Sequence, residues 1–498
     1  MVEIEKINEL YVKIKCDRGV AQELSEYFKF PVEGAKYTPA YKAKMWDGYI
    51  RLFNMNTHKI YSGLVRYIRE FCRVNNYQLV ENGHLETNNN IDLSITKDFI
   101  DSLQLSSKGS LIGIRDYQVE AVHKIINNNR AVLLAATSSG KSAIIYSLIR
   151  HFLTKDMKCL ILVPNTSLVS QLYSDFQDYS GISQWSVEDN CQKLYSGLDK
   201  EFTRKCLITT WQSILAMLKS KEIGKPFLNQ FDMVLFDEAH LSKSKCLIDI
   251  LECTTNTKYR IGTTGTLDNC TANIMQIEGL LGPVHKVVTT KELIDNNMAT
   301  QLDITCLLLD YDDETKKTVS KMLYQDEMDF LVTNFNRNKF IANLTKAQKG
   351  NTLVLFQYVE KHGKVLYNMI QDRVGNTRKL YFISGEVKPD ERERIRLAIE
   401  HDVDAIIVAS FATCSTGLNI PSIENIIFSS PTKSKIRNLQ SIGRGLRLKK
   451  GKNICNLYDI GDNLAHKKKK NFTLQHLSER IKQYSAEGFT YKVVNIKL

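Results

Sequence analysis

Hydrophobic and polar positions divide the chain into regions of different texture. Up to about residue 105, alternating positions at 11–16 and 49–53 predict short strands, and helical spacing at 20–30 and 64–74 predicts helices. The polar segment 82–90 ends in three asparagines and predicts a loop. This region is therefore expected to form a small α+β domain.

From about residue 110, short apolar segments alternate with amphipathic helical ones. The segments expected as buried strands are 131–136, 159–164, 206–210, 233–237 and 259–263, then 352–356, 380–384, 405–410, 426–430 and 454–460. Alternation of this kind predicts an α/β fold with two tandem doubly wound parallel-sheet domains. A helix at 472–484 and a strand at 490–498 are expected to close the chain.

These textures predict four segments. Residues 1–105 form the small α+β domain, 106–297 the first α/β domain, 298–466 the second, and 467–498 a basic carboxyl-terminal extension of helix plus strand.

Composition narrows the class of protein. Of the 498 residues, 43% are hydrophobic and 24% charged, as in ordinary globular proteins. The 11 cysteines never form a CxxC pair, which argues against zinc-ribbon and thioredoxin-type sites and favours reduced thiols. The chain lacks an apolar run of about 20 residues and a secretory signal, so a cytoplasmic protein without membrane contact is expected.

Positive charge is concentrated in two places. The net charge is +12. The range 432–470 contains 12 basic residues and two acidic ones, and the range 36–73 contains 8 basic residues and two acidic ones. Such clusters are the places where phosphate contacts are expected, although a solvated basic surface is the alternative for each.

A phosphate-binding loop is the first candidate site. Ala135 and Ala136 precede the sequence Thr137, Ser138, Ser139, Gly140, Lys141 and Ser142, between a predicted strand and a predicted helix. Backbone N–H groups at a helix start attract phosphate oxygens. Lys141 is expected to reach the β- and γ-phosphates and Ser142 to ligate Mg²⁺. A chance strand-to-helix turn is the alternative.

An acidic pair supports this interpretation. Asp237 and Glu238 follow an apolar strand, at the sheet edge where a Mg²⁺ contact is needed. Asp237 is then a metal-site residue and Glu238 the group that polarises the attacking water. An ordinary acidic strand-end loop is the alternative.

Two further elements suit a nucleotide site. Gln118, with Arg115 nearby, has an amide that can pair with the edge of adenine, although Gln118 taken alone fits an ordinary surface helix residue better. Gln440, Arg444 and Arg447 lie on a predicted helix of the second α/β domain, and the two arginines share one face. They can stabilise charge on the γ-phosphate, contact nucleic acid, or form a basic surface.

Taken in this order and spacing, these elements resemble the superfamily 2 helicases. The resemblance covers about residues 110–460 and includes Thr264 with Thr266, the segment 382–386 and the segment 409–421. It implies two RecA-like domains that use ATP and Mg²⁺. Ser138 and Gly265 depart from the usual pattern. Thr264 and Thr266 are expected to couple the ATP and nucleic-acid sites, or else form a plain strand end.

The family also implies nucleic-acid contacts along both domains. The positions that match its motifs are Thr166, Gln171, Thr210, Trp211, Ser384, Thr413 and Thr416. Hydroxyl contacts to phosphates carry little sequence information, as a motor on any sequence requires.

A narrower likeness extends to the whole chain. Segments 44–53, 137–142, 272–276 and 434–447 resemble the recombination helicases of T-even-type bacteriophages. This implies remodelling of branched DNA: junction branch migration, fork regression and R-loop dissociation. Branched and single-stranded DNA are the expected partners, with RNA–DNA hybrids and a single-stranded-DNA-binding or recombination protein as further candidates for a monomeric enzyme in the host cytoplasm.

Substrate choice is assigned to the amino-terminal domain. Lys42, Lys44 and Arg51 are expected to hold DNA phosphates, while Trp46, Tyr49 and Phe53 are expected in the domain core rather than stacked on bases. An RNA helicase, or a duplex translocase subunit of a restriction or remodelling complex, shares the ATPase motifs and remains open.

Overall fold

The computed structural model describes most of the chain. The described residues are 1–32, 34–83, 85, 89–195, 202–241, 245–267, 270–387, 389–417, 420, 422–432, 434–447, 452, 454–467 and 469–498, without the side chains of 245–247, 389, 390, 392, 393, 400, 415–417, 435–437 and 444. They divide into two compact units, Met1–Ala135 with Gly140–Val287, and Ala136–Ser139 with Val288–Leu498. Each unit is described in turn.

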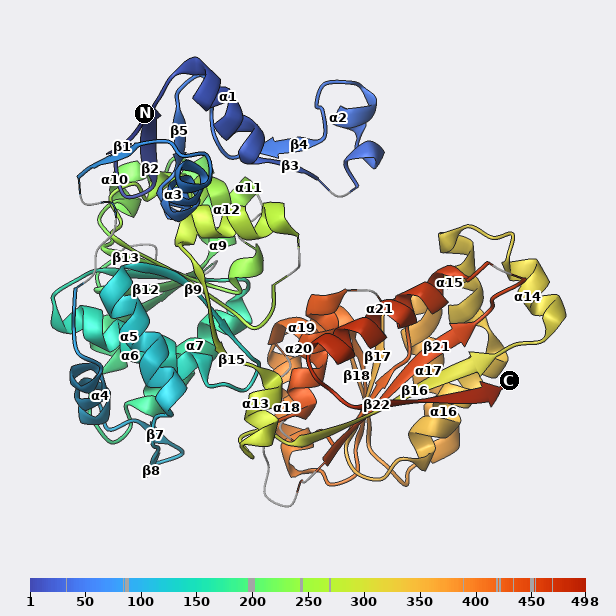
Figure 1. Ribbon diagram of the computed structural model, residues 1–498. Coiled ribbons are helices and arrows are strands. Elements are labelled where there is room, and N and C mark those ends of the chain that lie inside the picture. The colour runs from blue at the N-terminus through green and yellow to red at the C-terminus, as the bar shows by residue number, and fades with distance from the viewer. Residues whose placement is uncertain are drawn as a thin grey trace. The chain divides into compact units, whose positions relative to one another are not determined.

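The amino-terminal domain is built on a four-stranded sheet in the order β5-β2-β1-β6 (Figure 1). Its elements are β1 (Val2–Lys6), β2 (Tyr11–Lys15), α1 (Arg18–Tyr27), β3 (Lys29–Pro31), η1 (Ala35–Tyr37), α2 (Pro39–Lys42), β4 (Tyr49–Arg51), β5 (Lys59–Tyr61), η2 (Ser62–Leu64), α3 (Val65–Val74) and β6 (Leu79–Asn82). The next elements, α4 (Leu93–Ser102), β7 (Ser106–Ser107) and β8 (Ser110–Leu111), belong to the packing of the following sheet, since Ile100, Leu103 and Leu105 lie in its core. Inward residues of the sheet, such as Ile4, Val12 and Ile14, pack with α1 and α3 into one core. The α+β prediction is confirmed, although the helix expected at 20–30 ends at Tyr27, because Lys29–Pro31 pairs antiparallel with Tyr49–Arg51.

A seven-stranded sheet follows in the same unit, in the order β11-β12-β10-β13-β14-β9-β15. Its elements are α5 (Asp116–Asn128), β9 (Arg130–Ala135), α6 (Lys141–Thr154), β10 (Cys159–Val163), α7 (Thr166–Tyr179), α8 (Val187–Asn190), β11 (Cys191–Leu194), β12 (Cys206–Thr210), α9 (Trp211–Lys219), α10 (Lys225–Leu228), β13 (Met233–Asp237), η3 (Ala239–Leu241), α11 (Lys245–Cys253), β14 (Tyr259–Thr264), α12 (Thr271–Leu281) and β15 (Val284–Val288). The strands from β11 to β9 pair in parallel.

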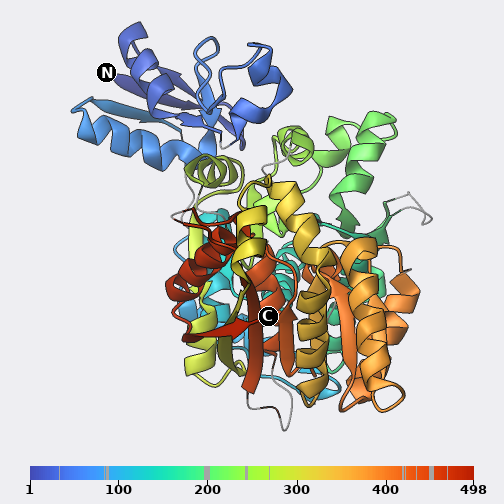
Figure 2. The same cartoon turned by 90° about the vertical axis from the view of Figure 1, so that its right-hand side faces the viewer.

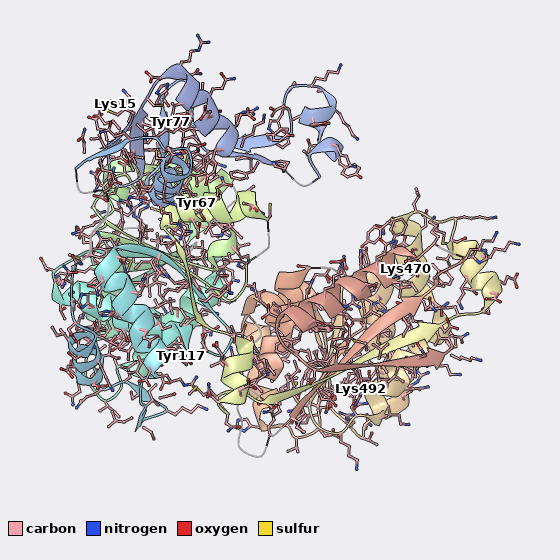
Figure 3. All side chains as sticks on the ribbon, in the orientation of Figure 1. Lys15, Tyr67, Tyr77, Tyr117, Lys470 and Lys492 are labelled. Carbon is pink, nitrogen blue, oxygen red and sulfur yellow. The ribbon has the colours of Figure 1, made fainter. Side chains whose placement is uncertain are left out.

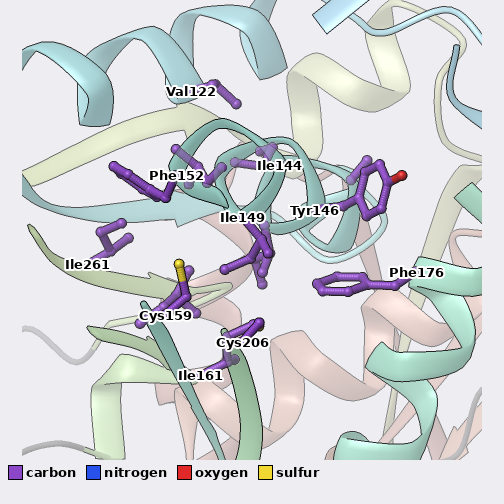
Figure 4. Close-up of a cluster of buried hydrophobic side chains, with 14 of the residues drawn as sticks. Val122, Ile144, Tyr146, Ile149, Phe152, Cys159, Ile161, Phe176, Cys206 and Ile261 are labelled. Carbon is purple, nitrogen blue, oxygen red and sulfur yellow. The ribbon is translucent and has the colours of Figure 1, made fainter. Parts of the chain in front are cut away.

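Both faces of this sheet are buried, as its apolar strands predict. Ile161 faces the core beneath α5, α6 and α7, and its neighbours Leu160 and Leu162 face the core beneath α9, α11 and α12. Figure 4 shows the first of these cores, in which Phe152 and Ile149 of α6 lie over strand residues such as Ile261. The carboxyl ends of these strands position the residues of the candidate nucleotide site.

The second unit contains another seven-stranded sheet, in the order β18-β19-β17-β20-β21-β16-β22. Its elements are α13 (Thr290–Asp295), β16 (Gln301–Asp310), α14 (Asp313–Val319), α15 (Tyr324–Thr333), α16 (Phe335–Ala347), β17 (Thr352–Phe356), η4 (Val359–Gly363), α17 (Lys364–Val374), β18 (Leu380–Ile383), α18 (Pro389–His401), β19 (Ile406–Ser410), α19 (Phe411–Gly417), β20 (Asn425–Phe428), α20 (Lys435–Gly445), β21 (Ile454–Asn463), α21 (Phe472–Ala486) and β22 (Tyr491–Lys497). Two parallel-sheet domains in tandem confirm the predicted fold class.

The carboxyl-terminal helix and strand are integral to this second sheet. β22 pairs in parallel with β16, from Ile304 opposite Tyr491 to Asp310 opposite Lys497. Arg480 of α21 is fully buried and pairs with Asp459 of β21 at 2.8 Å. The segment 467–498 is thus part of the second domain's packing rather than only an extension. Within the described residues, no helix is long and apolar enough to cross a membrane.

Candidate nucleotide and nucleic-acid sites

The phosphate-loop sequence forms a tight turn between β9 and α6. Ser138 and Gly140 have left-handed backbones, with φ of 69° and 79°, and Ser139 between them does not. Alternating handedness of this kind turns successive N–H groups toward one side and makes a concavity suited to anions. Gly140 caps α6, whose first residue is Lys141. The local geometry therefore suits phosphate oxygens.

Two side chains at the start of α6 already have partners. The Lys141 ammonium donates to the Ala135 carbonyl at 3.2 Å, and the Ser142 hydroxyl lies 2.8 Å from the Tyr179 hydroxyl at the end of α7. Tyr179 carried no signal in the sequence, because its position depends on how α7 packs against α6.

Gln118 lies directly against the loop. Its amide oxygen accepts from the Arg115 backbone N–H at 2.9 Å, and together they form a capping box at the start of α5. A Cβ at Gly140 would lie 2.3 Å from the Gln118 amide nitrogen, so this position requires glycine for space as well as for φ. Gln118 is buried, and the Arg115 guanidinium donates to the Tyr117 hydroxyl. Adenine recognition by Gln118 stays a prediction.

Asp237 is the last residue of β13, at the carboxyl end of the strand. One of its carboxylate oxygens accepts from the Thr263 hydroxyl at 2.8 Å and from the Glu238 backbone N–H at 3.0 Å. Burial and the neighbouring Glu238 carboxylate raise the pKa of Asp237, while Lys141 and the Thr263 hydrogen bond lower it. Two carboxylates on consecutive residues favour a bound cation.

Glu238 has a strained backbone, with φ of +55°. Left-handed conformations are uncommon for residues other than glycine and are concentrated at functional sites. One carboxylate oxygen of Glu238 lies 3.2 Å from His240 Nδ1.

His240 joins the acidic pair to the end of β14. Its Nδ1 lies 3.0 Å from the Thr264 hydroxyl, which itself donates to the Thr266 carbonyl at 2.9 Å. All three groups are buried. Thr264 and Thr266 are thus part of a hydrogen-bonded chain that leads to Glu238. The role of His240 was missed from the sequence, although its place two residues after Glu238 was a usable signal.

The donor set fits Mg²⁺. No cluster of three His, Cys, Asp or Glu side chains able to hold a metal occurs among the described residues. Mg²⁺ instead takes one or two protein oxygens together with phosphates and water. Ser142 and Asp237 offer such oxygens. Burial, together with the neighbouring Glu238 carboxylate, raises the pKa of Asp237, and a bound cation would favour the ionised carboxylate.

The predicted nucleic-acid contacts of the first unit differ in exposure. Thr166 is exposed at the first position of α7, whereas Gln171 and Trp211 are half-buried. Thr210 is buried and caps α9, accepting from the Ser213 backbone N–H at 3.1 Å. The neighbouring Gln212, not singled out from the sequence, is exposed and donates to the Pro164 carbonyl.

The predicted site residues of the second unit are mostly buried. Ser384 accepts from the Glu386 N–H at 3.3 Å, Thr413 lies 2.8 Å from the Ser410 hydroxyl, and Gln440 is buried on α20. The Arg447 carbonyl accepts from Thr300 at 3.0 Å. The side chains of Arg444 and Thr416 lie outside the described residues.

The basic and aromatic residues of the amino-terminal domain separate into two groups. Phe53 is buried in the core, but Tyr49 is 38% exposed and Trp46 is half-buried. The expectation that all three are core residues is wrong, because β4 pairs only with β3, outside the four-stranded sheet. Lys42 and Lys44 are exposed, and the exposed Arg51 pairs with Asp47.

This domain is fastened to the rest of its unit at α12. Glu278 is nearly fully buried and accepts from Arg66 and from the Tyr67 hydroxyl, each at 2.6 Å. Tyr67 projects from α3 toward α12 in Figure 3, and the turn of Figure 2 also shows these helices side by side. Tyr11 and Tyr61 likewise donate to Glu252 of α11, at 2.8 and 3.2 Å.

Comparison with known proteins follows the same division. The family described as "DNA helicase UvsW, N-terminal" matches residues 4–81, "Type III restriction enzyme, res subunit" matches 111–269, and "Helicase conserved C-terminal domain" matches 336–449. The chain is 32% identical to the ATP-dependent DNA helicase uvsW of Enterobacteria phage T4, over 98% of both chains.

Solved structures agree with this assignment. The crystal structure of T4 UvsW covers all of this chain and 99% of its own, with 29% identity and a TM-score of 0.53. A fragment of a putative HsdR subunit of a type I restriction enzyme from Vibrio vulnificus YJ016 has a TM-score of 0.58 at 15% identity, over 87% of this chain and 83% of that one, and shares the fold. The chain belongs to the UvsW family, and is an ATP-dependent helicase of superfamily 2.

Proposed function

We propose that this helicase uses ATP hydrolysis to remodel branched DNA in recombination, repair and replication: it migrates junctions, regresses forks and dissociates R-loops. The observation that carries the proposal is the likeness to T4 UvsW over 98% of both chains, the amino-terminal domain included. A general duplex-separating activity would not require that domain.

The chemistry begins at the phosphate loop. Backbone N–H groups of residues 137–142 hold the phosphates of ATP, and Lys141 leaves the Ala135 carbonyl to contact the β- and γ-phosphates. Gln118 and Arg115, next to the loop, contact the nucleotide. Ser142 and Asp237 hold Mg²⁺, which when bound offsets the charge on the phosphate oxygens.

Glu238 is the group that acts on water. Its carboxylate orients a water molecule toward the γ-phosphorus and accepts a proton as the new P–O bond forms and the bond to the ADP oxygen breaks. His240 holds that carboxylate in place through the 3.2 Å contact. In the ATP-bound state, Gln440, Arg444 and Arg447 of the second unit supply contacts to the γ-phosphate.

The nucleic-acid strand is held by phosphate contacts. Thr166 begins α7 and Gln171 lies in its second turn. Thr210 caps α9, which begins at Trp211. Ser384, Thr413 and Thr416 supply the matching contacts of the second unit. Buried hydroxyls such as Thr210 and Thr413 act by orienting the adjacent backbone N–H groups. Contacts of this kind are independent of base sequence.

The amino-terminal domain supplies preference for branched substrates. Lys42, Lys44 and Arg51 lie on one exposed segment of it and hold duplex or single-strand phosphates. We also propose that the protein acts on DNA in the cytoplasm of an infected cell. It does so as a monomer, with recombination or single-stranded-DNA-binding proteins as partners.

The test is ATP-dependent strand separation on a four-way junction, on a fork and on a linear partial duplex of equal length and salt. Faster separation of the branched DNAs is the expected result. Lys141→Ala is the inactive control and should abolish strand separation on all three DNAs. Equal rates on all three would contradict the branched-DNA proposal. ATP hydrolysis without strand separation would favour a duplex translocase, and activity confined to RNA strands would favour an RNA helicase.

A further inference from the structure

A cavity lies beside the seven-stranded sheet of the second unit, between two segments that follow neighbouring strands. One segment follows β16 and comprises the end of α14 and the turn before α15, and the other follows β21 and leads into α21. The strands from β18 to β16 all pair in parallel, so this is also the edge where Ser384 follows β18. Among the described residues, the lining includes none of those that match helicase motifs. The cavity is therefore a feature that the proposed chemistry does not use.

The walls of the cavity suit a flat ring. Val319, Met322, Leu464 and Phe472 supply apolar surface, and the Phe472 ring is held at 81° to the Tyr324 ring with centroids 5.8 Å apart. The volume is about 180 Å³. A water takes about 30 Å³, and pockets for drug-sized ligands begin at about 300 Å³. The space therefore suits one ring system rather than a whole cofactor.

A buried carboxylate in the wall is compensated by the protein itself. Glu327 is 1% exposed and accepts from the backbone N–H groups of Phe472 and Thr473, at 3.0 and 2.8 Å. It also accepts from the Asn471 amide at 2.9 Å and the Thr473 hydroxyl at 2.8 Å. The neighbouring Asp326 is exposed and belongs to the cap of α15. These bonds, two of them from the first turn of α21, fix the wall and offset charge that would otherwise oppose an anionic ligand.

Lysines border the opening of the cavity. Lys469 and Lys470 are exposed and belong to the lining, and Lys321 and Lys467 are exposed in the same two segments. The Lys469 ammonium donates to the Ser320 carbonyl at 2.9 Å, which ties the two segments together and leaves two of its three N–H donors for a ligand. Lys470 is labelled in Figure 3, where α21 begins. An apolar slot for one ring, bordered by ammonium groups, matches a base flanked by its phosphates.

We propose that this cavity takes the base of one unpaired nucleotide of the DNA strand, turned out of its stack. The Phe472 ring lies against the base, and Lys469 and Lys470 hold the flanking phosphates. The inference rests on the proposed function, because it takes DNA as the ligand, and it adds a contact that the helicase motifs do not supply. Every base has a ring face, so a motor can use such a contact on any sequence. Its place at the same sheet edge as Ser384 favours a strand over a free nucleotide.

The first test is photo-cross-linking of the full-length protein to single-stranded oligothymidylate that carries one 5-iododeoxyuridine. Irradiation links this base to a side chain in contact with it. The cross-linked peptides are expected to include one that contains Phe472 or Met322. Cross-links confined to other peptides would overturn the proposal. Linkage of free 5-iododeoxyuridine monophosphate at Phe472, without linkage of the strand, would show a free-nucleotide site and overturn it as well.

The second test removes the ring and keeps apolar volume. Phe472→Leu is expected to abolish the cross-link at the cavity and to weaken binding of single-stranded DNA by about 5-fold or more. Phe340→Leu is the matched control, because Phe340 is also half-buried, packs against the core of the same unit and does not belong to the lining. It should change neither readout. Equal losses in the two variants would contradict the role of the Phe472 ring.

A third test addresses the phosphate contacts. Lys470→Gln is expected to reduce the slope of log affinity against log salt concentration by about 0.7 for single-stranded DNA. Lys482→Gln, at an exposed position of α21 outside the lining, should leave the slope unchanged. An unchanged slope for Lys470→Gln would contradict the assignment of this lysine.

The results separate the cavity from the proposed function. If the wild type separates branched DNAs faster but no strand cross-links at the cavity, the cavity proposal is wrong and the function stands. If the strand cross-links at Phe472 but the wild type separates all three DNAs equally fast, the cavity binds a base and the branched-DNA function is wrong.

Discussion

The hydroxyl of Tyr179 lies 2.8 Å from that of Ser142, so the last residue of α7 holds the side chain proposed to ligate Mg²⁺. The same helix begins at the exposed Thr166, a proposed nucleic-acid contact. Val169 and Phe176 bury one face of α7 in the core, which favours movement of the helix as one piece.

The Tyr179→Phe substitution should therefore alter the demand for Mg²⁺. The change removes a hydrogen bond worth about 1 kcal/mol and frees Ser142 for the metal, which predicts a roughly 5-fold lower half-saturating Mg²⁺ concentration in ATP hydrolysis without DNA. If α7 transmits the binding of a DNA strand to the ATP site, the stimulation of ATP hydrolysis by DNA should also fall. Titrations of ATPase rate against Mg²⁺, with and without single-stranded DNA, measure both effects.

The neighbouring Tyr146 is the control for this experiment. It packs against Tyr179 with ring centroids 5.6 Å apart, and its hydroxyl accepts from Arg150 rather than contacting Ser142. Tyr146→Phe should leave the Mg²⁺ dependence unchanged. Equal effects of the two substitutions would show that packing, not the Tyr179 hydroxyl, controls the site.

The Thr263→Val substitution should move the acidic limb of the pH–rate profile. Asp237 must be ionised to hold Mg²⁺, and its pKa is raised above the ordinary 3.8 by burial and by Glu238. The Thr263 hydroxyl opposes that shift by donating to the carboxylate, so its loss raises the pKa further. Activity should then disappear at a higher pH as the solution is acidified.

Measurement of kcat/KM for ATP as a function of pH, from neutral pH down to the acidic limit of the folded protein, checks this prediction. Thr209→Val is the matched control, since this buried threonine donates to the Leu194 carbonyl and not to a carboxylate. A limb that stays in place, or moves to lower pH, would refute the role given to Thr263.

Much of the fold could be predicted from the pattern of the chain, for a definite physical reason. Strands such as Cys159–Val163 and Thr352–Phe356 are buried on both faces, so they are continuous apolar segments with helices between them. The strand β16 was missed from the sequence, whereas β22 was expected as a strand but not placed in this sheet. β22 is mostly exposed, and its position beside β16 is set by the packing of α21 rather than by its own sequence.

The candidate site divides in the same way. Lys141, Ser142, Asp237 and Glu238 were predictable because phosphate and metal chemistry demands particular residues next to particular strand ends. Tyr179 and the bond from Thr263 to Asp237 depend on contacts between separate elements, which no local pattern records. The exposure of Tyr49 reflects a ribbon that leaves the main sheet, a tertiary feature that short alternation does not reveal.

The Gly63→Ala substitution should loosen the amino-terminal domain from α12. A Cβ at this position would lie 2.0 Å from the Glu278 backbone carbonyl oxygen, closer than any real contact, so the two elements must separate. The hydrogen bonds from Arg66 and Tyr67 to Glu278 would be strained or lost. Hydrogen exchange should rise in α3 and α12, and branched-DNA preference should fall while ATP hydrolysis with single-stranded DNA persists.

Gly83→Ala is the comparison for this experiment. A Cβ there meets open space, but φ of +91° strains the backbone, so this variant separates backbone strain from steric conflict at the contact. Exchange confined to the vicinity of residue 83 is expected. If Gly63→Ala leaves exchange in α12 unchanged, the domain is held by contacts other than those around Glu278.

Arg480→Met should strongly destabilise the second unit. Arg480 and Asp459 are both fully buried, at 2.8 Å, and Arg480 also donates to the Thr432 carbonyl at 2.9 Å. Removing one partner leaves the Asp459 charge without its cation in the core, and such losses cost about 3–5 kcal/mol. Because α21 carries Arg480 and leads into β22, local unfolding should begin with α21 and β22.

Hydrogen exchange of α21 and β21, compared with that of the exposed Lys482→Met variant on the same helix, measures the effect. A difference below about 1 kcal/mol between the two variants would mean that Tyr484, whose hydroxyl donates to Asp459 at 2.8 Å, and water suffice to compensate the carboxylate.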